Sequence, residues 1–150
     1  MNNVNSLPSE RVALLTAVAP SSSSAAQTSG WVDAAGFRRI MAVISAGVFG
    51  SSATIDAKLR QATSSGGAGA KDITGAALTQ MLAAGGNNKQ AIINLNTDSL
   101  DATNGYRYVG LTLTVGTAAS LVSAELFGFD AFNDPASMSN PAAVVQTVSA

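Results

Sequence analysis

The 150-residue sequence contains no cysteine and no histidine. The lack of cysteine excludes a disulfide framework, a thiolate zinc site and a cysteine nucleophile. The lack of histidine removes the commonest general base and the commonest metal ligand. Charged residues make up only 11% of the chain and the formal net charge is −1, whereas a typical soluble domain has roughly 25% charged residues. Because charge keeps protein surfaces apart, this composition predicts that other chains cover part of the surface. It also predicts no nucleic-acid partner, which would need clustered Lys and Arg.

Long hydrophobic runs are missing too. The longest apolar run, residues 40–50, is interrupted by Ser45 and is shorter than the about 20 residues that cross a bilayer. The first residues, MNNVNSLPSER, lack the basic start and apolar run of a signal peptide. We therefore expect a soluble protein without a membrane partner, made in a reducing or neutral compartment. At this length the chain can enclose a core as a single domain.

The clearest pattern lies in residues 53–73, ATIDAKLRQATSSGGAGAKDI. Its first half alternates with a period of two, which predicts a β-strand with one apolar and one polar face. The apolar face consists of Ala53, Ile55, Ala57 and Leu59, and the polar face of Thr54, Asp56, Lys58 and Arg60. The stretch SSGGAGA cannot continue this strand. We expect a mobile loop there, followed by a second extended segment.

Similar patterns predict further strands in residues 11–19, closed by Pro20, and in residues 37–48, 89–96, 106–115 and 120–129. Two of them, 37–48 and 120–129, are apolar on both faces. For 37–48 this predicts a central strand covered by the opposite sheet and by a subunit. The dipeptide Asn104-Gly105 favours a tight turn.

Short strands with frequent turn signals predict an all-β fold, a two-sheet antiparallel β-sandwich. A jelly roll and an immunoglobulin-like arrangement both fit. Residues 1–29 are predicted to form an N-terminal arm and the first strand, residues 30–130 the sandwich, and residues 131–150 a C-terminal arm. Within that arm, residues 142–148 (AAVVQTV) resemble a strand that pairs with a neighbour.

The glycine-rich stretch GGAGAK, residues 66–71, suggests a phosphate-binding loop. A P-loop, however, needs a last glycine directly before the lysine, Ser or Thr after it, and then a helix. Here Ala70 precedes Lys71 and Asp72 follows it. We therefore favour a flexible connection between two strands.

The carboxylates offer two possible sites. Asp98 and Asp101 with Glu125 could form an acid–base pair for glycoside hydrolysis, and oxygens of Asp98, Asp101 and Asn104 could hold calcium. The spacing matches no calcium loop, and aspartates in a turn usually bond nearby backbone amides. We expect turn-forming residues, no cofactor, no metal and no enzymatic activity.

Two further groups of residues are candidates for contacts. Arg38 and Arg39 could cluster with Lys58 and Arg60 as a docking surface for an acidic partner, or form a solvated face with Asp56 as the counterion. The aromatic residues Trp31, Tyr106 and Tyr108 could stack on a sugar, although aromatic residues at strand starts are more often core or interface anchors.

Taken together, GWVDAAGFRRIMAVI, ATIDAKLRQATSSGGAGAKDITG, KQAIINLN and NGYRYVGLTLTVGTAASLVSAELFGFD resemble a known family. This family comprises small structural proteins encoded among the head genes of tailed bacteriophages and related gene-transfer particles. The similarity covers about residues 30–130 and includes no catalytic residue. It implies a virion protein, either a capsid decoration (cement) protein or a head-spike component.

The resemblance implies the major capsid protein as partner, a place on the outer surface of the capsid and synthesis in the host cytoplasm. Closed symmetry favours a homotrimer. Two alternatives are a receptor- or carbohydrate-binding module displayed on the virion, and a component of the tail or connector. Residues 64–71 and the two arms are expected to touch neighbours, and the candidate interface residues are Trp31, Arg38, Arg39, Gly66, Gly67, Gly69, Lys71, Tyr106 and Tyr108.

Overall fold

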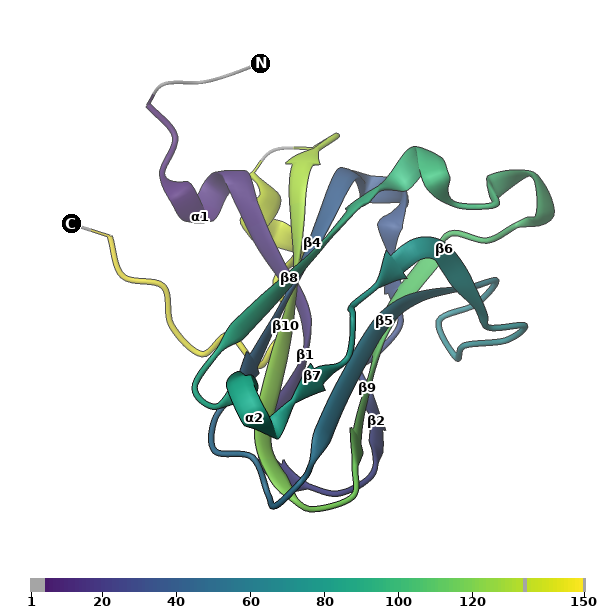
Figure 1. Cartoon of the computed structure of the whole chain (residues 1–150). Coiled ribbons are helices and arrows are strands. Elements are labelled where there is room, and N and C mark those ends of the chain that lie inside the picture. Colours follow the sequence, from purple (N-terminus) through teal and green to yellow (C-terminus); the bar gives the residue numbers. More distant parts are fainter. Residues whose placement is uncertain (1–4, 134, 150) are drawn as a thin grey trace.

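The computed structural model describes residues 5–133 and 135–149. Two antiparallel sheets face each other in a sandwich (Figure 1). The first sheet has four strands, in the order β1 (Val12–Ser23), β10 (Ser120–Ala131), β4 (Phe37–Ala46) and β8 (Gln90–Asn96). The second has the order β2 (Ala26–Thr28), β9 (Tyr108–Gly116), β5 (Thr54–Ala62) and β6 (Lys71–Ala77). Two short strands extend it, β3 (Val32–Asp33) beside β9 and β7 (Met81–Leu82) beside β5.

The strand pairing is nested. β1 pairs with β10, β2 with β9, β4 with β8, and β5 with β6, so the first main strand pairs with the last and each later pair lies inside the previous one. Eight main strands in two sheets with this connectivity form a jelly roll. The predicted all-β sandwich is therefore confirmed, and of the two arrangements that fitted the sequence the structure has the jelly roll.

The core lies between the sheets and follows the predicted alternation. Ala53, Ile55, Ala57 and Leu59 on β5 are buried, as are Val109, Leu111, Leu113 and Val115 on β9. The central position of β4 is confirmed, because β10 and β8 flank it on either side. Its residues Ile40, Ala42 and Ile44 point into the core, whereas Met41 and Val43 on the other face are only half-buried in the single chain.

The first strand differs from its predicted end at Pro20. It continues to Ser23, because β1 is an edge strand and Pro20 lies in an irregularity of the pairing, between Val18 and Ser21. Proline is tolerated at such positions since no hydrogen bond of the ladder is lost. Within the predicted N-terminal arm, α1 (Pro8–Arg11) precedes this strand.

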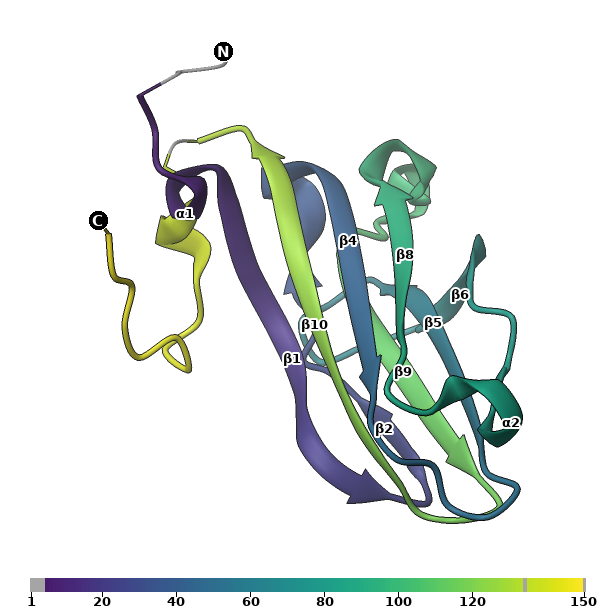
Figure 2. The same cartoon turned by 60° about the vertical axis from the view of Figure 1, so that its left-hand side comes forward.

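Short helical turns make up the connections: η1 (Ala34–Gly36), α2 (Ala83–Gly86), η2 (Thr97–Ser99), η3 (Ala102–Asn104) and η4 (Ala136–Ser139). The helix η4 contacts β1, β10 and α1, and its Ala136 is only 1% exposed. The start of the predicted C-terminal arm is thus part of the sandwich, because η4 covers the side of the core beside β1 (Figure 2).

The rest of the C-terminal arm has no regular secondary structure. Residues 142–148, predicted to resemble a strand, form a turn and then an irregular segment in the single chain. A seven-residue segment without a neighbouring strand has no ladder to join. Residues 1–4 of the predicted N-terminal arm and residues 134 and 150 of the C-terminal arm lie outside the described part.

Candidate interaction surface

The predicted aromatic and glycine residues meet on the outer face of the six-stranded sheet. Val109 and Leu111 of β9 point into the core, so Gly110 between them faces outward. The indole of Trp31 lies on Gly110, because a Cβ built there would be 3.0 Å from the indole Cε3. A Cβ on Gly67 would lie 2.8 Å from the indole Cε2. Both glycines therefore allow backbone to approach the ring, and the loop between β5 and β6 folds back onto it.

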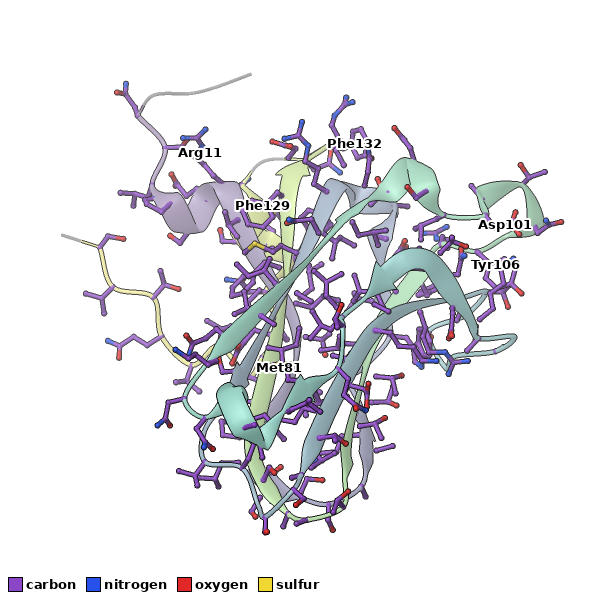
Figure 3. All side chains as sticks on the ribbon, viewed as in Figure 1. Arg11, Met81, Asp101, Tyr106, Phe129 and Phe132 are labelled. Carbon is purple, nitrogen blue, oxygen red and sulfur yellow. The ribbon has the colours of Figure 1, made fainter. Side chains whose placement is uncertain are left out.

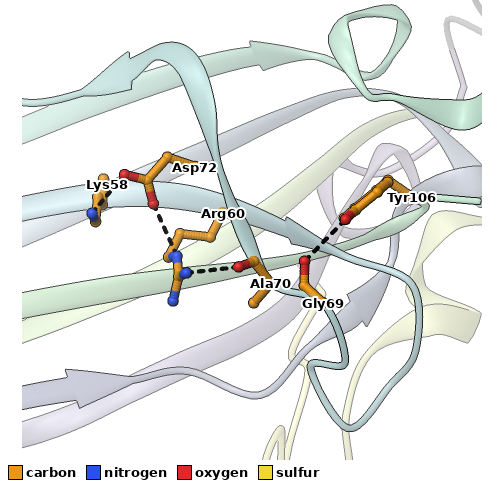
Figure 4. Close-up of polar contacts among 6 residues, drawn as sticks. All are labelled: Lys58, Arg60, Gly69, Ala70, Asp72 and Tyr106. Atoms are coloured by element: carbon orange, nitrogen blue, oxygen red, sulfur yellow. Dashed lines mark hydrogen bonds and ion pairs between the residues drawn. The ribbon is translucent and has the colours of Figure 1, made fainter. Parts of the chain in front are cut away.

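This loop, for which we expected mobility, has a set of hydrogen bonds of its own. Within it, the Thr63 N–H and Oγ1 both donate to the Ala68 carbonyl, and Ser64 Oγ accepts from the N–H groups of Gly66 and Ala68. Its end is held from outside as well. The Tyr106 hydroxyl donates to the Gly69 carbonyl at 3.1 Å (Figure 4). The loop leads into strand β6 and not into a helix, so the phosphate-binding hypothesis has no helix N-terminus to rest on.

Arg60 connects the loop to the sheet. Its Nη2 donates to the Ala70 carbonyl at 2.9 Å and its Nε to Asp72 Oδ1 at 3.0 Å (Figure 4). Asp72 also accepts a hydrogen bond from Lys58 at 2.7 Å. This bond holds the pKa of Asp72 below its usual value, and the bond from Arg60 acts in the same direction. The counterion of Lys58 and Arg60 is therefore Asp72, whereas Asp56, which we had predicted, accepts a hydrogen bond from Gln80.

Lys71, at the end of this loop, interacts with two partners, Asp101 and Tyr106. Its Nζ donates to Asp101 Oδ2 at 2.5 Å and lies 4.0 Å from the centre of the Tyr106 ring. Asn104 Nδ2 donates to both oxygens of Asp101. The hydrogen bond from Lys71, followed by that from Asn104, keeps the pKa of Asp101 below its usual value. Asp101 is thus a turn residue that pairs with Lys71.

Another ion pair joins β3 to the segment before β9. Arg107 donates to both carboxylate oxygens of Asp33 and its guanidinium lies 5.6 Å from the centre of the Tyr108 ring. The bond lowers the pKa of Asp33 and raises that of Arg107. The three aromatic side chains therefore already have partners within the chain: Trp31 has two glycines, Tyr106 has Lys71 and Tyr108 has Arg107.

The carboxylates proposed for an acid–base pair or a calcium site do not lie together as either site would require. Glu125 lies in the middle of β10, opposite Val43 of the four-stranded sheet, while Asp101 pairs with Lys71 at the start of β6 in the other sheet. Asp98 lies in η2, where its own N–H bonds to the Asn96 side chain. Within residues 5–133 and 135–149, no group of three or more acidic side chains is placed to hold a metal ion. In the same residues, no helix has the length and apolar character to cross a membrane.

Arg38 and Arg39 do not join Lys58 and Arg60. They lie on β4 of the four-stranded sheet, whereas Lys58 and Arg60 lie on β5 of the other sheet. Arg38 is 4.8 Å from the centre of the Phe132 ring and Arg39 pairs with Asp130 at 3.4 Å. Figure 3 shows Phe132 at the top of the molecule and Tyr106 with Asp101 at the right. The predicted interface residues thus divide into two groups, with Arg38 and Arg39 apart from the other seven.

A third surface, on the outer face of the four-stranded sheet, combines several apolar side chains with two charged ones. Glu125 lies opposite Val43, and Arg39 lies opposite Phe129. Across the strands Leu14 lies opposite Phe127 and Phe127 opposite Met41, while in the next row Val43 lies opposite Ile92. Ile92 is 56% exposed and the others are half-buried. We call this set the outer-face patch, and it consists of Leu14, Met41, Val43, Ile92, Phe127 and Phe129. The apolar composition of both faces in residues 37–48 and 120–129 indicated it, but only the strand order shows that these residues are neighbours.

Comparisons with known proteins add a fold-level similarity. No protein-family model matches the chain, and a search of curated proteins finds no match. The structure is similar to a chain in infectious bursal disease virus strain Gx, with 12% identity, a TM-score of 0.39, and coverage of 84% of this chain and 33% of that one. It is also similar to a chain in the naturally occurring empty particles of cowpea mosaic virus, with 11% identity, a TM-score of 0.37, and coverage of 82% and 87%.

A third similar structure is that of Bacillus endospore appendages, described as disulfide-linked pili, with 14% identity, a TM-score of 0.33, and coverage of 85% and 98%. Two of these three structures are of virus particles, and this chain spans about a third of the bursal disease virus chain. Similarity of this degree assigns no function to the chain.

Proposed function

We propose that this chain is a structural protein of a bacteriophage particle, namely a decoration (cement) protein on the outside of the major capsid shell. The observation that carries this proposal is the outer-face patch. The opposite sheet already covers the inner face of β4 and β10, so Met41, Val43, Phe127 and Phe129 are not needed to form the chain's own core. Apolar side chains on both faces of a strand are typical of strands that are covered on both sides.

The two outer faces of the sandwich differ in a way that supports one docking face. The six-stranded sheet presents polar and ion-paired residues such as Lys58, Arg60 and Asp72. The four-stranded sheet presents the outer-face patch, whose apolar side chains outnumber the charged ones beside them, Glu125 and Arg39. Exposed apolar surface with polar residues around it marks sites of interaction with other proteins. We therefore propose that the four-stranded sheet faces the shell.

Three lines of support come from outside the patch. The segments of residues 30–130 resemble head structural proteins of tailed bacteriophages. The nested strand pairing is a jelly roll, a fold that occurs in viral capsid domains but also in lectins and cupins, so the fold alone is an analogy. The chemistry of cement is binding only: a ligand that binds the assembled shell and not its separate subunits shifts the equilibrium toward the shell. On this proposal the protein has no catalytic role and assembles as a homotrimer.

The carbohydrate-binding alternative receives less support from the geometry. A sugar platform needs free aromatic faces, and Lys71, Arg107 and Gly67 of the same chain lie against Tyr106, Tyr108 and Trp31. A component of the tail or connector would present the same fold, and the number of copies in the particle separates it from a cement protein.

Co-sedimentation with purified empty shells of the phage that encodes the chain tests the proposal. We expect the wild-type protein to sediment with the shells and Ile92→Asp to bind at least tenfold more weakly, because it places a charge in the outer-face patch. The matched control is Thr74→Asp, which introduces the same charge at an exposed position of β6 in the other sheet and should bind like the wild type. Equal binding of both variants, or no binding by the wild type, contradicts the proposal. Turnover of a glycan that stops in Glu125→Ala would instead establish an enzyme.

A further inference from the structure

The edge strands of the two sheets differ in how they avoid pairing with another chain. Natural proteins protect exposed edges with proline, charged residues, irregular pairing or very short strands. The edges of the described sheets are β1 and β8 in the first sheet, and β2 and β6 in the second. Three of these four strands carry such protection.

Each protected edge uses a different feature. β1 contains Pro20 and two irregularities of pairing, and its Leu14 N–H donates to Asn140 Oδ1 at 2.9 Å. β2 has only three residues. β6 begins with the charged pair Lys71 and Asp72, has an irregular register with β5, and contains Gly75 at a φ of +80°.

β8 has none of these features. Its sequence, QAIINLN, contains no charge and no proline, and its register with β4 runs without interruption from Gln90 to Asn96. The Ala46 N–H donates to the Lys89 carbonyl, and in an antiparallel pair alternate residues exchange the hydrogen bonds. Ala91, Ile93 and Leu95 therefore bond to β4. The N–H and C=O groups of Gln90, Ile92, Asn94 and Asn96 face the free edge.

The chain also carries a segment suited to that edge. Residues 144–149, VVQTVS, contain four β-branched residues and no charge, a composition that favours strands. Val145 is 93% exposed and Val148 is 78% exposed. In the described structure, residues 145–149 pair with no strand. An unpaired extended segment and an unpaired strand edge are the two partners that strand addition requires.

The segment of the same chain is poorly placed to reach this edge. Asn140 anchors the arm to Leu14 on β1, and β8 lies three strands away across the same sheet (Figure 2). At about 4.8 Å per strand, a strand added to the free edge of β8 would lie about 19 Å from β1, a path of about six residues at about 3.3 Å each. The step from Asn140 to Val144 spans at most about 13 Å at this rise per residue, so residues 144–149 of the same chain cannot lie along the whole of β8. A second copy has no such limit.

We infer that the C-terminal segment, residues 144–149, of one copy adds as a further strand to the free edge of β8 in a second copy. The donor segment leaves beside β1 and the acceptor edge lies on the opposite side of the same sheet, so the contact is head-to-tail and a ring satisfies every copy. The inference rests on the self-association proposed above and not on binding to the capsid.

Two experiments test the inference in the isolated protein. The first compares the mass of the full chain and of a chain that ends at Asn140, measured by sedimentation equilibrium at matched concentrations. The shortened chain keeps the contact between Asn140 and Leu14. We expect the full chain to be an oligomer and the shortened chain to have the mass of a single copy, with unchanged thermal unfolding.

The second experiment uses the absence of native cysteine. Asn94→Cys and Val145→Cys proteins are mixed and treated with a short bismaleimide crosslinker. We expect crosslinked dimers in this mixture and at least tenfold fewer in the control mixture of Thr74→Cys with Val145→Cys, because Thr74 lies on β6.

The outcomes separate the inference from the proposal on which it rests. A full chain that is monomeric at the highest soluble concentration overturns both the self-association and the strand addition. An oligomer that keeps its mass after shortening and gives no excess of crosslinks between positions 94 and 145 overturns the strand addition and leaves the homotrimer standing. Loss of the oligomer without those crosslinks also overturns the assignment to β8.

Discussion

The indole of Trp31 occupies the space above Gly110 in which any other residue at that position would carry its side chain. A Cβ built on Gly110 would meet the indole Cε3 at 3.0 Å and Cδ2 at 3.1 Å. The single tryptophan of the chain therefore reports on the packing of the glycine loop against the outer face of the six-stranded sheet.

Replacing Gly110 by alanine is expected to displace the indole and lower the free energy of unfolding by about 1–3 kcal/mol, the usual range for an added methyl group in a packed site. Denaturant unfolding measures the loss, and the tryptophan emission should shift to longer wavelength as the ring becomes more exposed. Gly85→Ala is the control, because a Cβ at Gly85 meets nothing within 4 Å. Equal stability of the two variants would contradict the assigned contact.

Ser29, between β2 and β3, continues the hydrogen bonding of both strands to β9. Its Oγ accepts a hydrogen bond from the buried N–H of Leu111 at 2.9 Å. Ser29→Ala leaves this donor without its partner and is expected to destabilise the fold by about 1–3 kcal/mol. Ser24→Ala, at an exposed position, should change stability by less than about 0.5 kcal/mol. Unfolding in guanidinium chloride measures the stability of both variants. A Ser29→Ala protein as stable as the wild type would contradict a stabilising role for this hydroxyl.

The glycine loop should lose protection when Arg60 is removed, since its guanidinium bonds to the Ala70 carbonyl. In Arg60→Ala we expect faster hydrogen exchange in residues 64–71, with little change in the core strands. Lys58→Ala is a matched control, because Lys58 shares the partner Asp72 but makes no bond to the loop backbone in the described structure. If both variants exchange alike, Arg60 does not hold the loop.

Stability should fall at acid pH and stay level near neutrality. The pKa values of Asp33, Asp72 and Asp101 lie below the usual value of 3.8 in the folded chain, so these carboxylates stabilise the fold above that pH and stop doing so as the pH falls through their folded pKa values. With no histidine, no side chain of ordinary pKa titrates between about pH 5 and 8.

Thermal unfolding at pH values from 2 to 8 measures this dependence. The fall in unfolding temperature below about pH 4 should be small, because exposed ion pairs contribute little to stability. This fall should be smaller in the Asp101→Asn protein than in the Asp98→Asn protein. Asp98 takes part in no ion pair between described residues. A steep loss of stability between pH 5 and 7 would show that another group controls the titration.

Local pattern was enough to predict most of the sandwich. The alternation in residues 53–60 predicted which side chains of β5 are buried, and the one in residues 106–115 did the same for β9. Residues 89–96, predicted as a strand, contain the regular strand β8, in which Ile93 and Leu95 are buried. These predictions succeed because a strand with one buried face imposes a period of two on its own sequence.

Side-chain contacts that depend on the order of strands in the sheets could not be predicted from the sequence. Arg38 and Lys58 both lie in predicted strands but belong to different sheets, and Asp33 meets Arg107 only because β3 pairs with β9. The hydrogen bonds that hold residues 63–70 could not be predicted for the same reason, since Arg60 and Tyr106 lie outside the loop. Glycine content alone indicated flexibility, whereas here glycine allows close packing against Trp31.

The number of copies per particle tests the central claim most directly. Quantitative mass spectrometry of purified virions of the encoding phage, with the major capsid protein as internal reference, provides this number. A cement protein should be present in hundreds of copies, comparable to the major capsid protein. A dozen copies or fewer would place the chain in the tail or connector, and absence from the particle would contradict a role in the virion altogether.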